Sequence, residues 1–258
     1  MKISVLASGS KGNSCFIKTN NGSYLIDIGT TCGYVEKQLK DLNEDIKQIK
    51  GIFITHAHTD HINGLKVFIK KYNPVIYLTE KMYNEISTLI DINNYYFISQ
   101  TLNLDDLLIT SIKTSHDTDD SVGYIFEEDG HSFVYITDTG YINVKNHKKL
   151  LNKNLYVLES NHDVSMLMDN PKYPYHLKQR ILGDKGHLSN EDSSYYLSKF
   201  IGENTKTIIL AHLSEHNNTK EIALNTLLKT LKENDKECDN IIIAEQNNRT
   251  ELVEVWLR

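Results

Sequence analysis

The segment THAHTDHINGL at residues 55–65 places three histidines and one aspartate within six positions, directly after the apolar run GIFI at residues 51–54. An ordinary surface loop would be rich in Gly, Ser and Asn instead. A buried segment could not tolerate these side chains unless each imidazole and carboxylate had a polar partner. The segment therefore indicates a site in which these side chains surround a common ligand.

The spacing of the four side chains favours a metal ion as that ligand. His56 and His58 are two residues apart, so they project to the same side of an extended chain. Asp60 and His61 open an expected helix, which directs them over the same turn. Imidazole and carboxylate ligands without a matching cysteine cluster suit zinc, manganese or iron. Four donors in this run could serve two ions, one at each pair.

Each ion needs further ligands from other parts of the chain. The candidates lie at the ends of expected strands: His116 in KTSHDT, Asp138 in VYITDTG and His212 in IILAHLS. The chain has 11 histidines, so any one of them at a strand end is more often an ordinary loop residue. The dense run of donors at residues 56–61 makes metal binding the better explanation for these histidines, and we expect a binuclear metal site.

The chain as a whole alternates short β-type runs with helical patterns. Strands are expected at residues 2–7, 14–19, 23–29, 51–55, 75–78, 107–114, 121–128, 132–140, 154–160, 205–212, 240–245 and 250–255. Helices are expected at residues 33–42, 61–72, 191–201 and 219–233. The Asp129-Gly130 pair predicts a hairpin, which implies mixed strand pairing. We predict an α/β fold, an αββα sandwich of two mixed β-sheets flanked by helices, as a single domain over residues 1–258.

Composition narrows the class of protein. The apolar fraction of 40% and the charged fraction of 24% are ordinary globular values. No apolar run approaches the about 20 residues that span a bilayer, and the N-terminal segment is expected to be a strand, not a secretory signal. Three cysteines without a CxxC pair argue against a disulfide framework, so we expect a cytoplasmic protein without membrane contact. The net charge of −6 counts against non-specific binding of polyanions.

The segment THAHTDHINGL resembles the signature of the metallo-β-lactamase superfamily of metallohydrolases, and His116, Asp138 and His212 match its later ligand motifs in order. The resemblance runs the length of the chain and implies the metallo-β-lactamase fold. Within the superfamily the chain is most similar to the YycJ/WalJ branch. The segments that carry this similarity are LASGSKGNS (6–14), LIDIG (25–29), VLESNHD (157–163), YPYHLKQRILGDKGHLSNEDS (173–193), AHLSEHNN (211–218) and AEQNNRTE (244–251).

The resemblance implies a metal-ligand set and the side chains that support it. It implies two divalent ions per chain, zinc or manganese with iron also possible, bound by His56, His58, Asp60, His61, His116, Asp138 and His212. Asp138 would bridge the two ions, and Asp60 would also take part in catalysis. Asp27 would brace the metal loop, and Glu159 and His162 would orient ligands by hydrogen bonds.

The resemblance also implies a catalytic residue outside the ligand set. GHLSN at residues 186–190 and AHLSEHNN at residues 211–218 resemble paired histidine motifs of phosphodiesterase branches. In those motifs the first histidine is catalytic and the second binds metal, which makes His187 the residue that handles a proton. The alternative is that His187 only precedes the helix that begins in SNEDSS.

Residues 171–185, PKYPYHLKQRILGDK, form a positive segment in an acidic protein. We expect Arg180 and Lys178 to bind phosphate and Tyr175 to stack on a base. The alternative is a plain surface loop whose tyrosines pack on the core. Together with two divalent ions, this segment would create a local anion site and offset the objection raised by the net charge.

The resemblance to the YycJ/WalJ branch implies a binuclear metal-dependent phosphodiesterase that acts on nucleic acid, as a DNA exonuclease of 5′–3′ polarity. A ribonuclease, a phosphodiesterase of small or cyclic substrates and a non-catalytic regulatory protein are the alternatives. A long positive segment suits a polymer, and a non-catalytic protein has no chemical need for the complete donor set. The resemblance makes DNA the favoured partner, while the sequence carries no signal of an oligomeric state.

Overall fold

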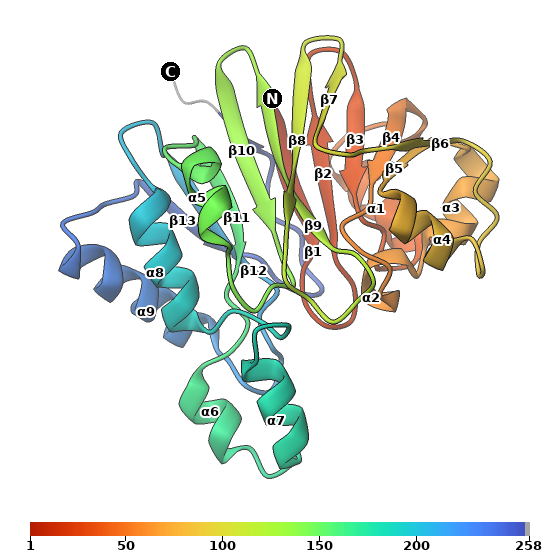
Figure 1. Ribbon diagram of the computed structural model, residues 1–258. Coiled ribbons are helices and arrows are strands. Elements are labelled where there is room, and N and C mark those ends of the chain that lie inside the picture. Colours follow the sequence, from red (N-terminus) through yellow and green to blue (C-terminus); the bar gives the residue numbers. More distant parts are fainter. Residues whose placement is uncertain (256–258) are drawn as a thin grey trace.

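A computed structural model describes residues 1–255 and contains two mixed β-sheets packed face to face (Figure 1). The strands of sheet A, in spatial order, are β14 (Val253–Glu254), β1 (Lys2–Ala7), β2 (Ser14–Lys18), β3 (Ser23–Ile26), β4 (Ile49–Phe53), β5 (Val75–Leu78) and β6 (Tyr95–Phe97). The strands of sheet B are β13 (Asn240–Ile243), β12 (Thr207–Ala211), β11 (Leu155–Glu159), β10 (His131–Ile136), β9 (Val122–Glu128), β8 (Leu107–Lys113) and β7 (Thr101–Leu104).

Each sheet combines an antiparallel half with a parallel half. In sheet A, β1 to β3 pair antiparallel and β3 to β6 pair parallel. In sheet B, β7 to β10 pair antiparallel and β10 to β13 pair parallel. The turn at Asp129 and Gly130 joins β9 to β10, as predicted. The predicted αββα arrangement with two mixed sheets is therefore confirmed.

An aromatic core joins the two sheets. Phe53 of β4 lies against Tyr124 and Phe126 of β9, with ring centroids 5.6 and 5.1 Å apart. Phe126 in turn stacks on Phe133 of β10 at 4.9 Å. All four side chains are fully buried. Such contacts stabilise the packing beyond the burial of area alone, and they fix the strand ends that carry the polar residues.

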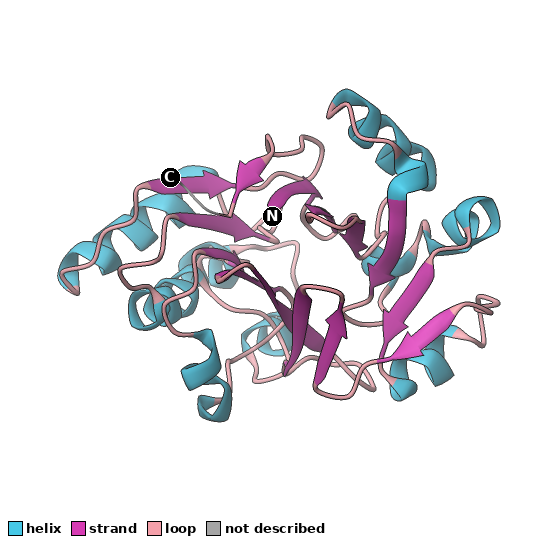
Figure 2. Cartoon of the chain, turned by 90° about the horizontal axis from the view of Figure 1, so that it is seen from above, coloured by secondary structure: helices cyan, strands magenta, loops and turns pink. Residues whose placement is uncertain are grey.

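Helices cover the outer faces of both sheets (Figures 1 and 2). Those beside sheet A are α1 (Cys32–Asp41), α2 (Thr59–Ile62), α3 (Leu65–Tyr72) and α4 (Glu80–Ile86), with a short 3-10 helix at Ile46–Gln48. Those beside sheet B are α5 (Val144–Leu150), α8 (Asn190–Phe200) and α9 (Lys220–Glu233). The Ser189 and Thr219 hydroxyls cap α8 and α9.

The expected helix at residues 61–72 is interrupted. It consists of α2 and α3, which meet at Gly64. There the backbone approaches the loop after β3, and a Cβ atom at Gly64 would lie 2.3 Å from the Thr30 carbonyl oxygen. Since only glycine allows this approach, the break holds the end of the histidine segment against the loop after β3.

Helices α6 (Val164–Asp169) and α7 (Tyr175–Leu182) extend beyond the sandwich at the bottom of Figure 1. Most of the positive segment at residues 171–185 is therefore helical, whereas the sequence suggested an arm or a loop. All residues of α7 are half-buried or exposed, so the helix has no buried stripe that would produce a hydrophobic period. Within residues 1–255, none of the helices has both the length and the apolar character to cross a bilayer.

Candidate metal centre

Polar residues meet at the edge of the sandwich where strands of both sheets end. His56 and His58 follow β4, Asp138 follows β10 and His212 follows β12. Asp138 and His212 both have a positive φ of 55°, and Asp27 after β3 has a φ of 56°. Non-glycine residues rarely adopt this left-handed conformation, and it concentrates at functional sites where the surrounding structure enforces it. Asp27, Asp138 and His212 thus share this conformation at the ends of three strands that deliver side chains to one site.

His56, His58 and His116 form a first cluster, in which one ligand atom of each lies within 4.8 Å of the others. His58 Nδ1 lies 3.2 Å from His116 Nε2. His56 Nε2 is buried and has no hydrogen-bond partner among residues 1–255. Burial lowers the pKa of both His56 and His116. Both rings are therefore neutral near pH 7, the form that binds a divalent cation.

A second cluster lies against the first and consists of Asp60, His61, Asp138 and His212. Asp138 Oδ2 lies 3.1 Å from His61 Nε2, and its Oδ1 lies 3.8 Å from His116 Nε2 in the first cluster. His212 Nε2 is buried, lies 3.7 Å from Asp60 Oδ2 and makes no hydrogen bond within the described chain. The Asp138 carboxylate therefore lies between the clusters, where a bridging ligand would be.

Charge is concentrated in the second cluster. Burial raises the pKa of Asp138, but the neighbouring His212 and His61 outweigh burial and hold that pKa well below its usual value. Burial lowers the pKa of His212, but Asp138, Asp60 and Glu159 outweigh it and raise the pKa to about 10. The pKa of His61 is likewise raised, against burial, by Asp138 and Asp27. A metal ion that binds here must displace protons from these two rings.

Two buried carboxylates orient the histidines. Asp27 accepts hydrogen bonds from His61 Nδ1 at 2.7 Å and from the Thr55 backbone N at 2.8 Å. Glu159 Oε1 accepts from His187 Nδ1 at 2.7 Å and from His212 Nδ1 at 2.9 Å. In each ring the bond at Nδ1 leaves Nε2 as the nitrogen for a ligand. These contacts are the ones expected of Asp27 and Glu159.

A third group within metal-binding distance consists of Asp138, Glu159, His187 and His212. The hydrogen bonds from the two Nδ1 atoms to Glu159 account for this group without a further ion. Glu159 Oε2 is also occupied, since it accepts from the backbone N atoms of Thr139 and Leu188 at 3.0 and 3.2 Å. Glu159 therefore acts as a buried hydrogen-bond acceptor.

His162 does not make the contact expected of it. Both of its ring nitrogens are buried and lack a hydrogen-bond partner in the described part of the chain. Burial lowers its pKa to about 4, so the ring is neutral. Only its backbone carbonyl is engaged near the site, where it accepts from the Asn190 N at 2.8 Å. The structure thus brings Glu159 but not the His162 side chain into contact with a ligand histidine.

A cleft of about 240 Å³ opens onto both clusters, and residues from both clusters as well as His187 and Arg180 line it. The His187 side chain is 20% exposed, and its Nδ1 is held by Glu159, which leaves the second ring nitrogen free for a proton transfer. Burial lowers the pKa of His187, but the Glu159 carboxylate outweighs burial and the pKa is raised. His187 is thus positioned at the cleft as a candidate proton donor.

Arg180 reaches the cleft from α7, but it already has a partner. Its guanidinium pairs with the Asp117 carboxylate, and Asp117 Oδ1 lies 3.4 Å from His116 Nε2. Burial raises the pKa of Asp117, but the hydrogen bond from Arg180 outweighs it and the pKa is lowered. The other two residues expected to bind substrate do not line the cleft. Lys178 donates to the Met168 carbonyl, and Tyr175 is 65% exposed.

The sequence pattern did not indicate Asn13 or Asp117 as site residues. Asn13 Nδ2 lies 3.1 Å from His61 Nε2 and 3.3 Å from Asp60 Oδ2. The available signals were the place of Asn13 in the LASGSKGNS segment and the position of Asp117 directly after His116. Neither signal distinguishes a site residue from an ordinary turn residue.

Comparison with known proteins agrees with the fold and the site. Residues 8–145 match the family model described as the metallo-beta-lactamase superfamily. The chain belongs to this superfamily, and the paired clusters make it a metal-dependent hydrolase whose site suits divalent metal ions. Within the superfamily it is a YycJ/WalJ-like member.

Two curated relatives cover most of the chain. It is 37% identical over 238 residues to exodeoxyribonuclease YycJ of Bacillus anthracis, with 90% of each chain covered. It is 37% identical over 241 residues to exodeoxyribonuclease WalJ of Streptococcus pneumoniae serotype 2 (strain D39), with 91% of this chain and 89% of the relative covered. The crystal structure of the metallo-beta-lactamase fold protein YhfI from Bacillus subtilis aligns with a TM-score of 0.70 at 15% identity, over 96% of this chain and 98% of that one. This last likeness concerns the fold alone.

Proposed function

We propose that this protein is a binuclear metal-dependent phosphodiesterase that degrades DNA as a 5′–3′ exonuclease. The observation that carries the proposal is the pair of ligand clusters separated by the Asp138 carboxylate, at the base of a cleft that also contains His187 and Arg180. The identity of 37% with two exodeoxyribonucleases supports DNA as the substrate.

Two divalent ions, zinc or manganese with iron as a further option, fit the donors present. His56, His58 and His116 would hold one ion and Asp60, His61 and His212 the other, with Asp138 shared. The buried Nε2 atoms of His56 and His212 support this assignment, because buried polar atoms without a hydrogen bond are rare unless a ligand takes their place. Bound ions would supply the positive charge that activates water and stabilises the oxygens of the phosphodiester.

Asp60 and His187 would move protons in the cleft. The Asp60 carboxylate lines the cleft as well as the second cluster, so it can accept a proton from the attacking water. His187 would deliver a proton to the departing sugar oxygen, which is a poor leaving group as an alkoxide. Glu159 would keep the His187 ring in place for this transfer through the hydrogen bond of 2.7 Å.

Arg180 would bind a phosphate oxygen of the substrate. A guanidinium forms strong, oriented hydrogen bonds with phosphate, as it does with the Asp117 carboxylate in the structure. The phosphate would compete with Asp117 for this group. Because the Arg180 side chain is 62% exposed, the exchange needs little rearrangement of the fold.

We further place the protein in the cytoplasm. Cys15, Cys32 and Cys238 are all free thiols. Free thiols of this kind are typical of a reducing compartment.

The proposed function can be tested with purified protein loaded with Mn²⁺ or Zn²⁺. The substrates are end-labelled single- and double-stranded DNA, the matching RNA strands and bis(p-nitrophenyl) phosphate. We expect metal-dependent digestion of DNA, abolished by chelation and by Asp138→Ala. Preferential digestion of RNA would identify a ribonuclease instead. Hydrolysis of the small ester alone would identify a small-molecule phosphodiesterase, and no hydrolysis by metal-loaded protein would favour a regulatory role.

A further inference from the structure

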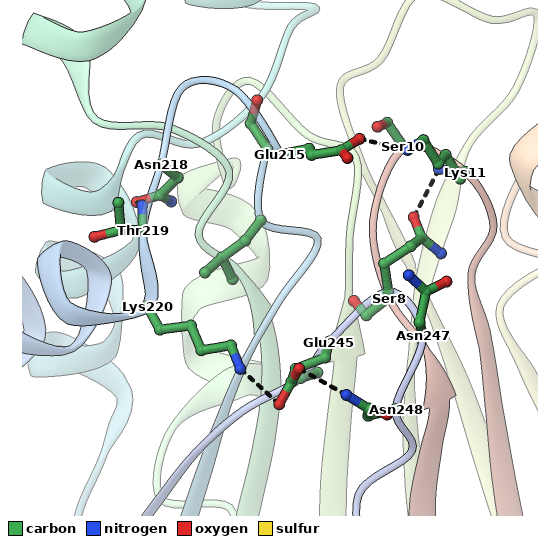
Figure 3. A pocket seen from close by; sticks show the side chains of 14 residues that line it. Ser8, Ser10, Lys11, Glu215, Asn218, Thr219, Lys220, Glu245, Asn247 and Asn248 are labelled. Carbon is green, nitrogen blue, oxygen red and sulfur yellow. Dashed lines mark hydrogen bonds and ion pairs between the residues drawn. The ribbon is translucent and has the colours of Figure 1, made fainter.

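A second cavity adjoins the cleft of the metal centre. Figure 3 shows side chains that line this cavity, whose volume is about 310 Å³. Ser10 and Ser214 line both the cavity and the cleft, so a ligand can extend from one into the other. The proposed reaction gives this cavity no role.

Three segments that are far apart in the sequence form this cavity, namely residues 8–11, 213–220 and 244–248. They are fixed to one another by hydrogen bonds. The Lys11 backbone N donates to Gln246 Oε1 at 2.8 Å, and Gln246 Nε2 donates to the Gly12 carbonyl at 2.9 Å. The His212 backbone N donates to Ser8 Oγ at 2.7 Å, which connects the wall of the cavity to a candidate metal ligand. The three segments that line the cavity therefore have fixed positions beside the metal centre.

The charges that line the cavity are balanced. Lys11 Nζ pairs with Glu215 Oε2 at 2.6 Å, and Lys220 Nζ pairs with Glu245 Oε1 at 2.6 Å. Figure 3 shows the first pair at one end of the cavity and the second pair at the other. Because each ammonium group has its own carboxylate, the cavity offers no net charge to a second phosphate. A neutral polar group suits it better.

The uncharged lining matches a nucleoside. Hydroxyl groups of Ser10 and Ser214 and the carboxamide of Asn247 face the same space. Hydroxyl and carboxamide groups both donate and accept hydrogen bonds, as the edges of a base and the oxygens of a deoxyribose require. The Asn247 side chain is exposed and makes no hydrogen bond to another residue in the described chain, so a ligand in the cavity can replace the water around its carboxamide.

We infer that this cavity holds the base and sugar of the terminal nucleotide while the phosphodiester lies at the metal centre. The inference rests on the proposed function, which supplies the phosphate at the adjoining cleft. Pockets for small molecules range over roughly 300–1,000 Å³, so a cavity of about 310 Å³ is large enough for one nucleoside. A pocket for one nucleoside beside the reactive centre is compatible with removal of one nucleotide at a time.

The test compares the binding of deoxyadenosine 5′-monophosphate with that of inorganic phosphate, by calorimetry on the metal-loaded protein. The variant Asn247→Ala removes the unpaired carboxamide, and Asn204→Ala is the matched control at an exposed asparagine in another turn. We expect the nucleotide to bind more tightly than phosphate. Loss of one neutral hydrogen bond should weaken nucleotide binding roughly 2- to 10-fold in Asn247→Ala, with phosphate binding unchanged and Asn204→Ala like the wild type.

A second variant, Asn247→Leu, replaces the carboxamide with an apolar side chain of similar size that neither forms hydrogen bonds nor stacks on a base, and it should weaken nucleotide binding as Asn247→Ala does while phosphate still binds. Equal affinity for nucleotide and phosphate in the wild type would overturn the inference. So would Asn247 variants that bind the nucleotide as the wild type does. The binding assay needs no turnover, so its failure is distinct from failure to digest DNA. A protein that digests DNA but lacks these differences retains the proposed function and loses only the nucleoside site.

Discussion

Replacement of His187 by alanine separates the proposed proton donor from the metal ligands. General acid help is typically worth about 10²–10⁴-fold in rate, equal to roughly 2.7–5.4 kcal/mol of activation free energy. We expect the turnover of DNA by His187→Ala to fall by that factor. The fold should persist, because Glu159 loses one hydrogen bond from His187 but keeps those from His212, Thr139 and Leu188.

The assay compares two leaving groups on the same protein. DNA releases a sugar alkoxide, which needs a proton, whereas bis(p-nitrophenyl) phosphate releases a nitrophenolate, which does not. The small ester should therefore be hydrolysed at close to the wild-type rate. Metal content, measured by elemental analysis, should be unchanged, because His187 belongs to neither of the two clusters assigned to metal. The matched control is His176→Ala, an exposed histidine of α7 outside the cleft.

Three results would refute this reasoning. Loss of metal together with activity would make His187 a ligand. Equal slowing of both substrates with metal intact would mean that it positions phosphate. An unchanged rate on DNA would leave it as a residue that merely precedes α8.

Four other changes have defined outcomes. Asp138→Ala should empty both metal positions in elemental analysis, and retention of one ion per chain would show that this carboxylate is not shared. Arg180→Ala should raise the KM for DNA roughly 10- to 100-fold, the worth of a charged hydrogen bond, with little effect on the small ester, while Lys185→Ala outside the cleft changes neither. Glu159→Gln should lower the free energy of unfolding by about 1–3 kcal/mol for an unmatched buried donor, measured by urea denaturation; an unchanged midpoint would contradict the hydrogen-bond network. Metal affinity should fall as pH is lowered, because the raised pKa of His212, about 10, means that a proton must leave for metal to bind; affinity independent of pH would argue against His212 as a ligand.

Local sequence patterns predicted twelve of the fourteen strands within residues 1–255 and missed β6 and β7, which lie at the edges of the two sheets. They also placed the histidine run directly after a buried strand. The apolar strand and the histidine run that follows it are contiguous in the sequence. Their relative position could therefore be predicted without knowledge of the rest of the fold. Asp138 and His212 could be predicted as site residues because each follows a buried strand. Strands β10 to β12 are parallel neighbours, so their ends meet at one edge of the sheet.

Contacts between distant segments could not be predicted in this way. Arg180 and Asp117 are 63 residues apart, and their pairing depends on how α7 packs. Because all residues of α7 are half-buried or exposed, its sequence shows no hydrophobic periodicity from which this packing could be predicted. The direction of Lys178 and Tyr175 away from the cleft follows from the same helix. The cavity proposed for the nucleoside depends on still more distant contacts, since its lining combines the segments that follow β1, β12 and β13.

The most direct measurement is a time course of DNA digestion by the metal-loaded protein, with one strand labelled at its 5′ end and a second sample labelled at its 3′ end. We predict that the 5′ label appears as mononucleotide from the first time point, while the 3′-labelled strand shortens gradually. Shortened fragments that retain the 5′ label, or intact DNA in the presence of protein that holds its metal, would contradict a 5′–3′ exonuclease.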